Sequence, residues 1–333
     1  MISTAAISDA ALTFIDSLAY EDQRAAAREP LDSRHRRCWT NAFTTWIPSG
    51  VLLDDLDQRQ RDAAMAVLEA TLSPRGFAEA RTVMALNKAL GDFVALHHDT
   101  LREWTYWFTI YGEPSEQGTW GWQLMGHHLV MNCLISGGEL VLSPVFMGAE
   151  MVEIDEGPLA GASALRDEQV AGLALARSLS TQQRALAVLY PSMLTADLPP
   201  PLQGRVEGRH RAGAGRDNLV LPYAGLNASE LSEEQVGLLL ALVKVFVGRK
   251  AQAHAEQEME RVRRHLAQTH FAWIGDPDSD GPFYYRVHSP VLLLEFDHHA
   301  GIFLTSDEPQ PFHIHTIVRT PNGGDYGMAL LRR

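Results

Sequence analysis

Two histidines near the C-terminus have the spacing of a metal-ligand pair. The segment Pro311-Phe312-His313-Ile314-His315-Thr316 has the alternating pattern of a β-strand. Alternate side chains of a strand point to one face, so the two imidazoles are expected on the same side, about 6.6 Å apart along the strand. Two imidazoles in this arrangement can bind one metal ion. We therefore interpret the chain first as a metal protein.

A second pair of histidines lies in an earlier strand-like run, Trp120–Ile135. Adjacent residues of a strand face opposite sides, so only one of His127 and His128 can point to a shared site. Gln123 would share a face with His127, and this polar companion slightly favours His127. Either residue remains a candidate ligand.

Two carboxylates complete the predicted ligand set. In the run Val291–Asp297, Glu295 and Asp297 share one face. Both would lie beside the late histidine pair if this strand pairs with the strand of His313 and His315. The predicted metal ligands are His127 or His128, Glu295, His313 and His315. Such nitrogen and oxygen donors suit a divalent ion such as zinc, iron, manganese or copper, whereas calcium prefers oxygen alone.

Candidate catalytic residues lie close to the predicted ligands. Asp297 or His298 could orient a ligand or carry a proton. His298 and His299 are expected just beyond the strand end, as ligands, a general base or loop residues. Arg286 and Arg319 are candidates to hold a substrate carboxylate, and a surface ion pair is the alternative for each. His97 and His98 are expected at a helix end, where the helix dipole favours a cation, so we assign them no site.

Other motifs point away from several enzyme classes. Asp276–Gly281 resembles the start of a calcium loop, but Val287 stands where the bidentate glutamate is needed, so the segment is predicted to be a turn. The chain has no Gly-x-Ser-x-Gly element, phosphate-binding loop or dinucleotide-binding glycine pattern.

Composition restricts the partners. The formal charge of −13 argues against nucleic acid, because phosphate binding needs a basic face. Two cysteines, Cys38 and Cys133, are too few for a disulfide scaffold or a thiolate zinc site. No run of about 18 apolar residues indicates a membrane span, and the N-terminus does not resemble a signal peptide. We expect a cytoplasmic protein with a small-molecule substrate; the sequence does not indicate its oligomeric state.

The order of helices followed by strands occurs twice. This pattern predicts an α+β fold with an antiparallel β-sheet core flanked by helices. The 333 residues are expected to form one large unit, which could consist of two joined lobes, 1–160 and 161–333.

Local signals set several boundaries. Capping pairs are predicted at Asp57/Gln60, Ser180/Gln183 and Ser232/Gln235, the last opening the longest helix, which would run to about Gln268. Gly137-Gly138 is predicted to be a hairpin turn between antiparallel strands. The proline- and glycine-rich stretch Leu198–Asp217 is predicted to be a loop that is mobile or covers a site.

Several of these elements together resemble a known family, the domain of unknown function numbered 3500. The resemblance covers nearly the whole chain. It rests on Leu72–Gly76, Tyr111–Pro114, Trp120–Gln123, Gly126–Leu129, Phe283–Arg286, Glu295–Asp297, His313–Thr316 and Asp325–Gly327. It supports the choice of His127, His128, His313 and His315, and it implies no particular reaction.

The leading hypothesis is a metal-dependent enzyme, with hydrolysis of a small organic substrate slightly favoured because it needs only one Lewis acid and one base. One alternative is an iron- or copper-dependent oxidoreductase with the same ligands. Another is a non-enzymatic binding protein in which the histidines only form a hydrogen-bonded cluster.

Overall fold

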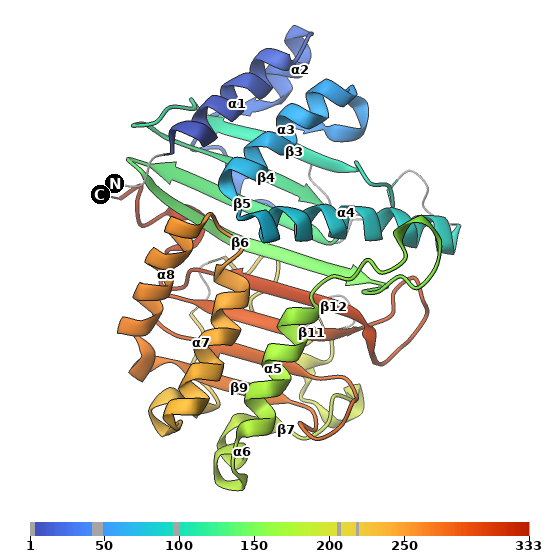
Figure 1. Cartoon of the computed structure of the whole chain (residues 1–333), viewed down its shortest axis with the longest axis vertical. Coiled ribbons are helices and arrows are strands. Elements are labelled where there is room, and N and C mark those ends of the chain that lie inside the picture. The colour runs from blue at the N-terminus through green and yellow to red at the C-terminus, as the bar shows by residue number, and fades with distance from the viewer. Residues whose placement is uncertain (1–3, 42–48, 96–99, 205–207, 218–219, 333) are drawn as a thin grey trace. The chain divides into compact units, whose positions relative to one another are not determined.

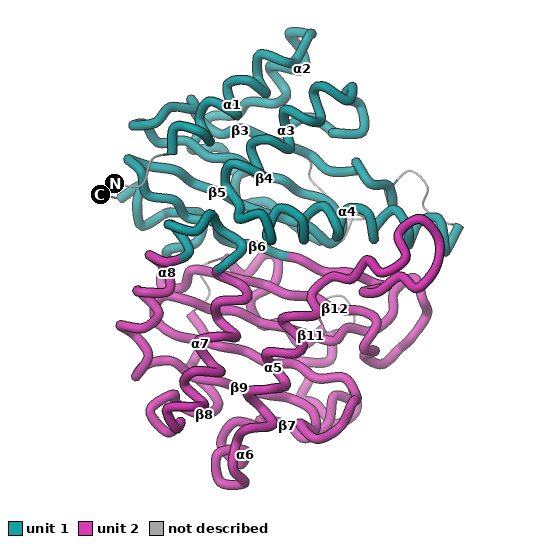
Figure 2. The backbone as a smooth tube through the Cα atoms, viewed as in Figure 1, with its two compact units in different colours: residues 1–146, 248–255, 323–333 teal, residues 147–247, 256–322 magenta. Residues whose placement is uncertain are grey.

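The computed structural model describes residues 4–41, 49–95, 100–204, 208–217 and 220–332 (Figure 1). His97 and His98, expected at a helix end, lie outside these ranges. The chain divides into two compact units, which Figure 2 colours separately. Unit 1 comprises Met1–Phe146, Gly248–Ala255 and Gly323–Arg333, and unit 2 comprises Met147–Val247 and Glu256–Asn322.

The helices of unit 1 are α1 (Ala5–Ser17), α2 (Glu21–Ala26), α3 (Gln58–Thr71) and α4 (Pro74–Val94), with short 3-10 turns at Arg34–Arg37, Leu53–Asp55 and Asp325–Gly327. Two of these helices, α3 and α4, begin at a side-chain cap. The predicted capping box is confirmed, because the Asp57 carboxylate accepts from the Gln60 N–H and the Gln60 side chain accepts from the Asp57 N–H. Ser73 caps α4, with Pro74 at the first helical position, which separates α4 from α3.

The strands of unit 1 form an antiparallel meander. In sheet order they are β1 (Arg28–Glu29), β3 (Tyr106–Gly112), β4 (Thr119–Gly126), β5 (Leu129–Ser136) and β6 (Glu139–Glu150), with β2 (Val51–Leu52) on β3. Only the short β1 runs parallel to its neighbour, β3. The hairpin predicted at Gly137-Gly138 is confirmed, since both glycines have the positive φ that a two-residue turn requires.

The expected single strand Trp120–Ile135 is wrong. It is a hairpin of β4 and β5, and His127-His128 form its two-residue turn after the last pair, Gly126 with Leu129. His128, the second residue of the turn, has φ of 63°, in the left-handed region that the same position of a type II turn occupies. The apolar pattern continues on both sides of this turn, so the reversal could not be recognised from the sequence.

The helices of unit 2 are α5 (Arg166–Ser178), α6 (Thr181–Ala187), α7 (Glu233–Val247) and α8 (Gln252–Arg264), with 3-10 turns at Gly157–Leu159, Thr195–Asp197, Pro200–Leu202, Ala228–Glu230 and Leu266–Gln268. Two of these helices, α6 and α7, begin at predicted caps. The Ser180/Gln183 and Ser232/Gln235 capping pairs both form the expected reciprocal hydrogen bonds.

The expected long helix from Ser232 to about Gln268 is wrong, because α7 ends at Val247 and α8 begins at Gln252. Between them the backbone carbonyl of Arg249 accepts from Ser73 N–H, and Ala251 N–H donates to Thr71. The Arg249 guanidinium also pairs with Glu79 at 2.8 Å. These bonds replace the helical ones, and α4, with 21 residues, is longer than either helix.

The strands of unit 2 follow the order β12 (Pro309–Arg319), β11 (Leu293–Ala300), β10 (Tyr284–His288), β9 (His270–Ile274) and β7 (Val188–Tyr190), with β8 (Leu226–Asn227) on β9. β11 and β12 pair antiparallel, as predicted, with Asp297 opposite His315. The placement of His298 and His299 beyond the strand end is wrong, because β11 continues to Ala300 through a register shift after His298.

Helices pack on one face of this sheet, and the loop at residues 209–212 packs on the other. Tyr285 of β10 packs against Phe246 of α7 and donates to the Glu168 carbonyl of α5, so its face meets the helices. Phe296 stacks on Tyr285 and belongs to that face. By alternation, Glu295 and Asp297 point to the opposite face, where backbone N–H groups of the loop at residues 209–212 bond to both carboxylates.

These elements confirm the predicted α+β class, with a mostly antiparallel sheet and flanking helices (Figure 1). Within the described ranges, no helix has both the length and the apolar character that a membrane crossing needs. The segment Asp276–Gly281 is a turn, as expected: the Asp276 side chain accepts from the Asp278 N–H, and Asp278 and Asp280 pair with Arg184 and Arg177.

Candidate metal centre

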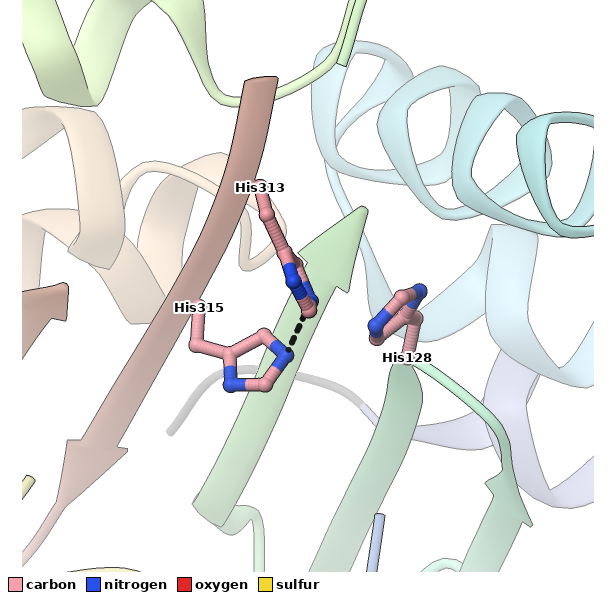
Figure 3. Close-up of side chains that lie close together, drawn as sticks. All are labelled: His128, His313 and His315. Carbon is pink, nitrogen blue, oxygen red and sulfur yellow. Dashed lines mark hydrogen bonds between the residues drawn. The ribbon is translucent and has the colours of Figure 1, made fainter. Parts of the chain in front are cut away.

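His313 and His315 turn their rings toward each other. They project from one face of β12, and their Nε2 atoms lie 2.9 Å apart (Figure 3). The ring planes are perpendicular, with centroids 4.6 Å apart, and both side chains are buried. The convergence predicted from strand alternation is confirmed.

The hydrogen bond at the far side of the His313 ring fixes its tautomer. His313 Nδ1 lies 2.7 Å from the carbonyl oxygen of Ala300. A carbonyl oxygen only accepts, so Nδ1 carries the proton and a neutral ring presents a lone pair at Nε2. The nitrogen that faces His315 is therefore the one that can bind a metal.

His128 is the other histidine of the early pair, and it lies in unit 1. The turn between β4 and β5 carries His128, whose side chain is buried, and its backbone N–H donates to the Asn41 side chain at 2.7 Å. In unit 2, a buried histidine cluster is formed by His299, His313 and His315, with ring centroids 4.3 to 4.9 Å apart. The imidazoles of His313 and His315 could hold a metal ion.

His127 has another environment. Its Nδ1 lies 2.6 Å from the side-chain oxygen of Asn87, and burial lowers its pKa to about 3. Its ring stacks on that of His128 at a centroid distance of 3.8 Å. The choice between His127 and His128 as a metal ligand stays a prediction.

Asp297 and His299 form a buried pair beside the two β12 histidines. Asp297 Oδ2 accepts from the Arg209 N–H at 3.1 Å and lies 3.3 Å from His299 Nδ1. The His299 ring stacks on His315 at 4.3 Å. His299 Nε2 and Asp297 Oδ1 are buried and have no hydrogen-bond partner among the described residues. His299 Nε2 and Asp297 Oδ1 are thus two polar atoms in the histidine cluster whose hydrogen-bonding capacity is not used by the described residues.

Glu150, at the end of β6, is a residue that the sequence reasoning missed. Its Oε1 accepts from the backbone N–H groups of Phe303 and Leu304, and its Oε2 lies 3.8 Å from His313 Nδ1. Burial raises the pKa of this carboxyl. No motif surrounds Glu150 in the sequence, so only the pairing of distant segments identifies it.

The loop at residues 209–212 donates hydrogen bonds to Glu295. Its carboxylate accepts from the N–H groups of Arg211 and Ala212 at 2.9 to 3.1 Å and from the Tyr284 hydroxyl. Burial and this carboxylate raise the pKa of Tyr284, so the hydroxyl stays a donor. Glu295 is not a member of the histidine cluster.

The other three predicted catalytic residues lie in different surroundings. The Arg319 guanidinium donates to the carbonyls of Ala212 and Gly213 and pairs with Asp217 at 3.2 Å. Arg286 is buried on β10, opposite Glu295.

His298 points to the helix-covered face, where its Nδ1 accepts from the Phe283 N–H and its ring contacts Phe283 and Phe296. Burial lowers its pKa to about 4. His299, one residue later, is the histidine that faces the cluster.

His210 is a second residue that the sequence reasoning missed. It lies in the predicted covering loop, and its ring centroid is 6.3 Å from that of His315. The clue was present in the sequence, because a histidine stands in the proline- and glycine-rich stretch that was expected to cover a site.

Comparison with known proteins gives one match. A family model described as "Protein of unknown function (DUF3500)" matches residues 1–328, in agreement with the resemblance noted in the sequence. No curated protein and no solved structure matches the chain.

Proposed function

Since the chain belongs to the DUF3500 family, whose description names no activity, we propose from the site geometry that it is a metal-dependent enzyme. One divalent ion would be held by His313 and His315. The observation that carries this proposal is the 2.9 Å distance between His313 Nε2 and His315 Nε2. The hydrogen bond at His313 Nδ1 leaves a lone pair on His313 Nε2.

A shared metal ion would account for the approach of the two rings. Zinc binds histidine nitrogen at about 2.0–2.1 Å, so two nitrogens on one tetrahedral ion lie about 3.3 Å apart, close to the spacing of the two Nε2 atoms. The carbonyl bond at His313 Nδ1 is the kind of outer contact that orients a metal-binding imidazole. The nearby Glu150 carboxylate adds negative charge behind the same ring.

The donor set favours zinc. Imidazole nitrogen is a usual ligand of catalytic zinc, whose sites leave one position open for water. Magnesium, calcium and manganese prefer carboxylate and carbonyl oxygen, whereas His313 and His315 offer nitrogen.

Hydrolysis is the reaction that these residues serve best. A bound zinc ion lowers the pKa of its water and supplies a nucleophile near neutral pH. His299 would accept a proton at Nε2, because Asp297 holds its Nδ1 and leaves Nε2 without another partner among the described residues. Asp297 is thus a positioning residue, and the substrate is a small organic molecule.

A redox metalloenzyme is the second candidate, because imidazoles also bind copper and iron. The nitrogen donors of His313 and His315 favour copper over iron, whose oxygenase sites usually add a carboxylate. Bound copper or iron with a spectral change in air would favour this candidate over hydrolysis.

Metal analysis tests the proposal. Protein purified without added metal is expected to contain about one equivalent of zinc by mass spectrometry, and the His313→Ala/His315→Ala variant is expected to contain almost none. His298→Asn is the matched control, because His298 is equally buried but faces away from the cluster. Equal metal content in a folded double variant, checked by circular dichroism, would overturn the proposal.

A further inference from the structure

A cavity adjoins the histidine cluster in unit 2. It has a volume of about 510 Å³, and its walls include Pro200, Pro201, His210, Arg211, Arg216 and Leu221. A cavity of this size accepts a small organic molecule. His210 belongs to this wall and lies 6.3 Å from the His315 ring, so the cavity leads toward the cluster.

Buried carboxylates hold the backbone of the cavity wall in place. Asp297 accepts from Arg209 N–H, and Glu295 accepts from the N–H groups of Arg211 and Ala212. From the other side, Arg319 donates to the carbonyls of Ala212 and Gly213. Three N–H groups and two carbonyls of this short stretch are therefore bonded to buried side chains, which fixes where the side chains of residues 210 and 211 begin.

A glycine lets this wall approach the cluster. Gly208 has φ of +58°, and a Cβ there would lie 2.0 Å from Asp297 Oδ2 and 2.4 Å from His299 Nδ1. Only glycine fits this contact at such a backbone angle.

The two arginines of the wall carry uncompensated charge. Neither the Arg211 nor the Arg216 guanidinium has a hydrogen-bond or ion-pair partner among the described residues, whereas Arg209 and Arg319 are bonded to the loop backbone. Two neighbouring arginines without a carboxylate partner are unusual in a chain with a net charge of −13. Two unpaired guanidinium groups on one cavity form a site for an anion.

The remaining wall restricts the kind of anion. The two prolines and Leu221 are apolar, and they suit the hydrocarbon part of a ligand. A planar guanidinium matches a carboxylate through two parallel hydrogen bonds. We propose that this cavity binds the substrate of the proposed metal enzyme and that the substrate is a small organic carboxylate, held by Arg211 and Arg216. This inference rests on the proposed function for the role of the ligand, but the anion site can be tested alone.

Calorimetric titration with benzoate tests the anion site in the full chain. We expect benzoate to bind and neutral benzamide to bind at least tenfold more weakly. Arg211→Gln/Arg216→Gln should weaken benzoate binding at least tenfold, whereas the control Arg59→Gln, an exposed arginine of unit 1, should leave it unchanged. Equal affinities for benzoate and benzamide, or no effect of the double variant, would overturn the inference. Tighter binding of phenyl phosphate than of benzoate would overturn the carboxylate assignment.

The same titration separates this inference from the proposed function. In the His313→Ala/His315→Ala variant the guanidinium groups remain, so benzoate should still bind within about threefold of the normal affinity. Benzoate binding by a protein that contains no metal would support the anion site and count against the metal enzyme. Stoichiometric metal without benzoate binding would overturn the anion site alone.

Discussion

His313 Nδ1 lies 2.7 Å from the carbonyl oxygen of Ala300, so the proton of this ring is on the side away from His315. Glu150 Oε2 stands 3.8 Å from the same nitrogen. The polar groups behind His313 thus prepare its Nε2 as a metal ligand, and they can be altered without touching the ligand itself.

Substitution Glu150→Gln should weaken metal binding about tenfold, the low end of the range for groups behind a metal-binding imidazole. The amide can still accept from Phe303 and Leu304, but the negative charge near His313 is lost. Competition with a chromophoric chelator measures the affinity. Glu153→Gln, an exposed residue three positions later, is the control; if both variants bind metal like the unaltered protein, Glu150 does not support the site.

Substitution Asp297→Asn should lower kcat for a chromogenic carboxylate-bearing ester about 100-fold while metal content stays unchanged, because a misplaced proton acceptor costs factors of this order. Asparagine retains an oxygen for the Arg209 N–H, but it no longer favours a proton on His299 Nδ1. Asp197→Asn, in a 3-10 turn of the same unit, is the control. A kcat within twofold of normal would remove Asp297 and His299 from the mechanism.

Substitution Gly208→Ala should destabilise the protein more than Gly215→Ala does. Both glycines have positive φ, +58° and +71°, so an alanine costs about 1–2 kcal/mol of backbone strain at either position. At Gly208 the new Cβ also meets Asp297 and His299, whereas at Gly215 nothing lies within 4 Å. Urea unfolding should therefore show an additional loss of about 1–3 kcal/mol for Gly208→Ala. Equal losses in the two variants would mean that the loop does not pack on β11 as described.

Acid should destabilise the fold through His298. Burial lowers its pKa from 6.5 to about 4, so between these values the unfolded chain binds a proton that the folded protein does not. The neutral ring makes its full contribution to the free energy of unfolding above pH 6.5. This contribution is lost as the pH falls toward 4, and the total loss is up to about 3 kcal/mol.

Urea unfolding at pH 7 and at pH 4.5 measures this loss. His298→Asn keeps an acceptor for Phe283 N–H and cannot titrate, so its stability should fall less over this interval than that of the unaltered protein. The same pH dependence in both proteins would mean that His298 is not buried in the neutral form.

Much of the local structure could be predicted from the sequence. Hydrogen bonds within a few residues decide helix starts, and the pairs Asp57/Gln60, Ser180/Gln183 and Ser232/Gln235 cap helices as expected. Strand alternation likewise placed His313 and His315 on one face, because it depends only on the extended backbone.

The errors arose where a distant segment decides the conformation. The turn at His127-His128 interrupts an apolar pattern that could equally continue as one strand. The bond between Arg249 and Ser73, which caps α4, and the bond between Ala251 and Thr71, at the end of α3, interrupt a pattern that predicts one helix. A shift in pairing with β12 keeps His298 and His299 inside β11.

The sequence by itself therefore determined the α+β class, the helix caps and the late histidine pair, since these follow from periodicity and local hydrogen bonding. The tertiary structure alone decided that His299 rather than His298 faces the cluster, that Glu150 stands behind His313, and that the wall of His210 and Arg211 is bonded to Glu295 and Asp297. These relationships join segments as much as 163 residues apart, from Glu150 to His313. Strand register and loop packing, which no local pattern encodes, fix which side chains meet.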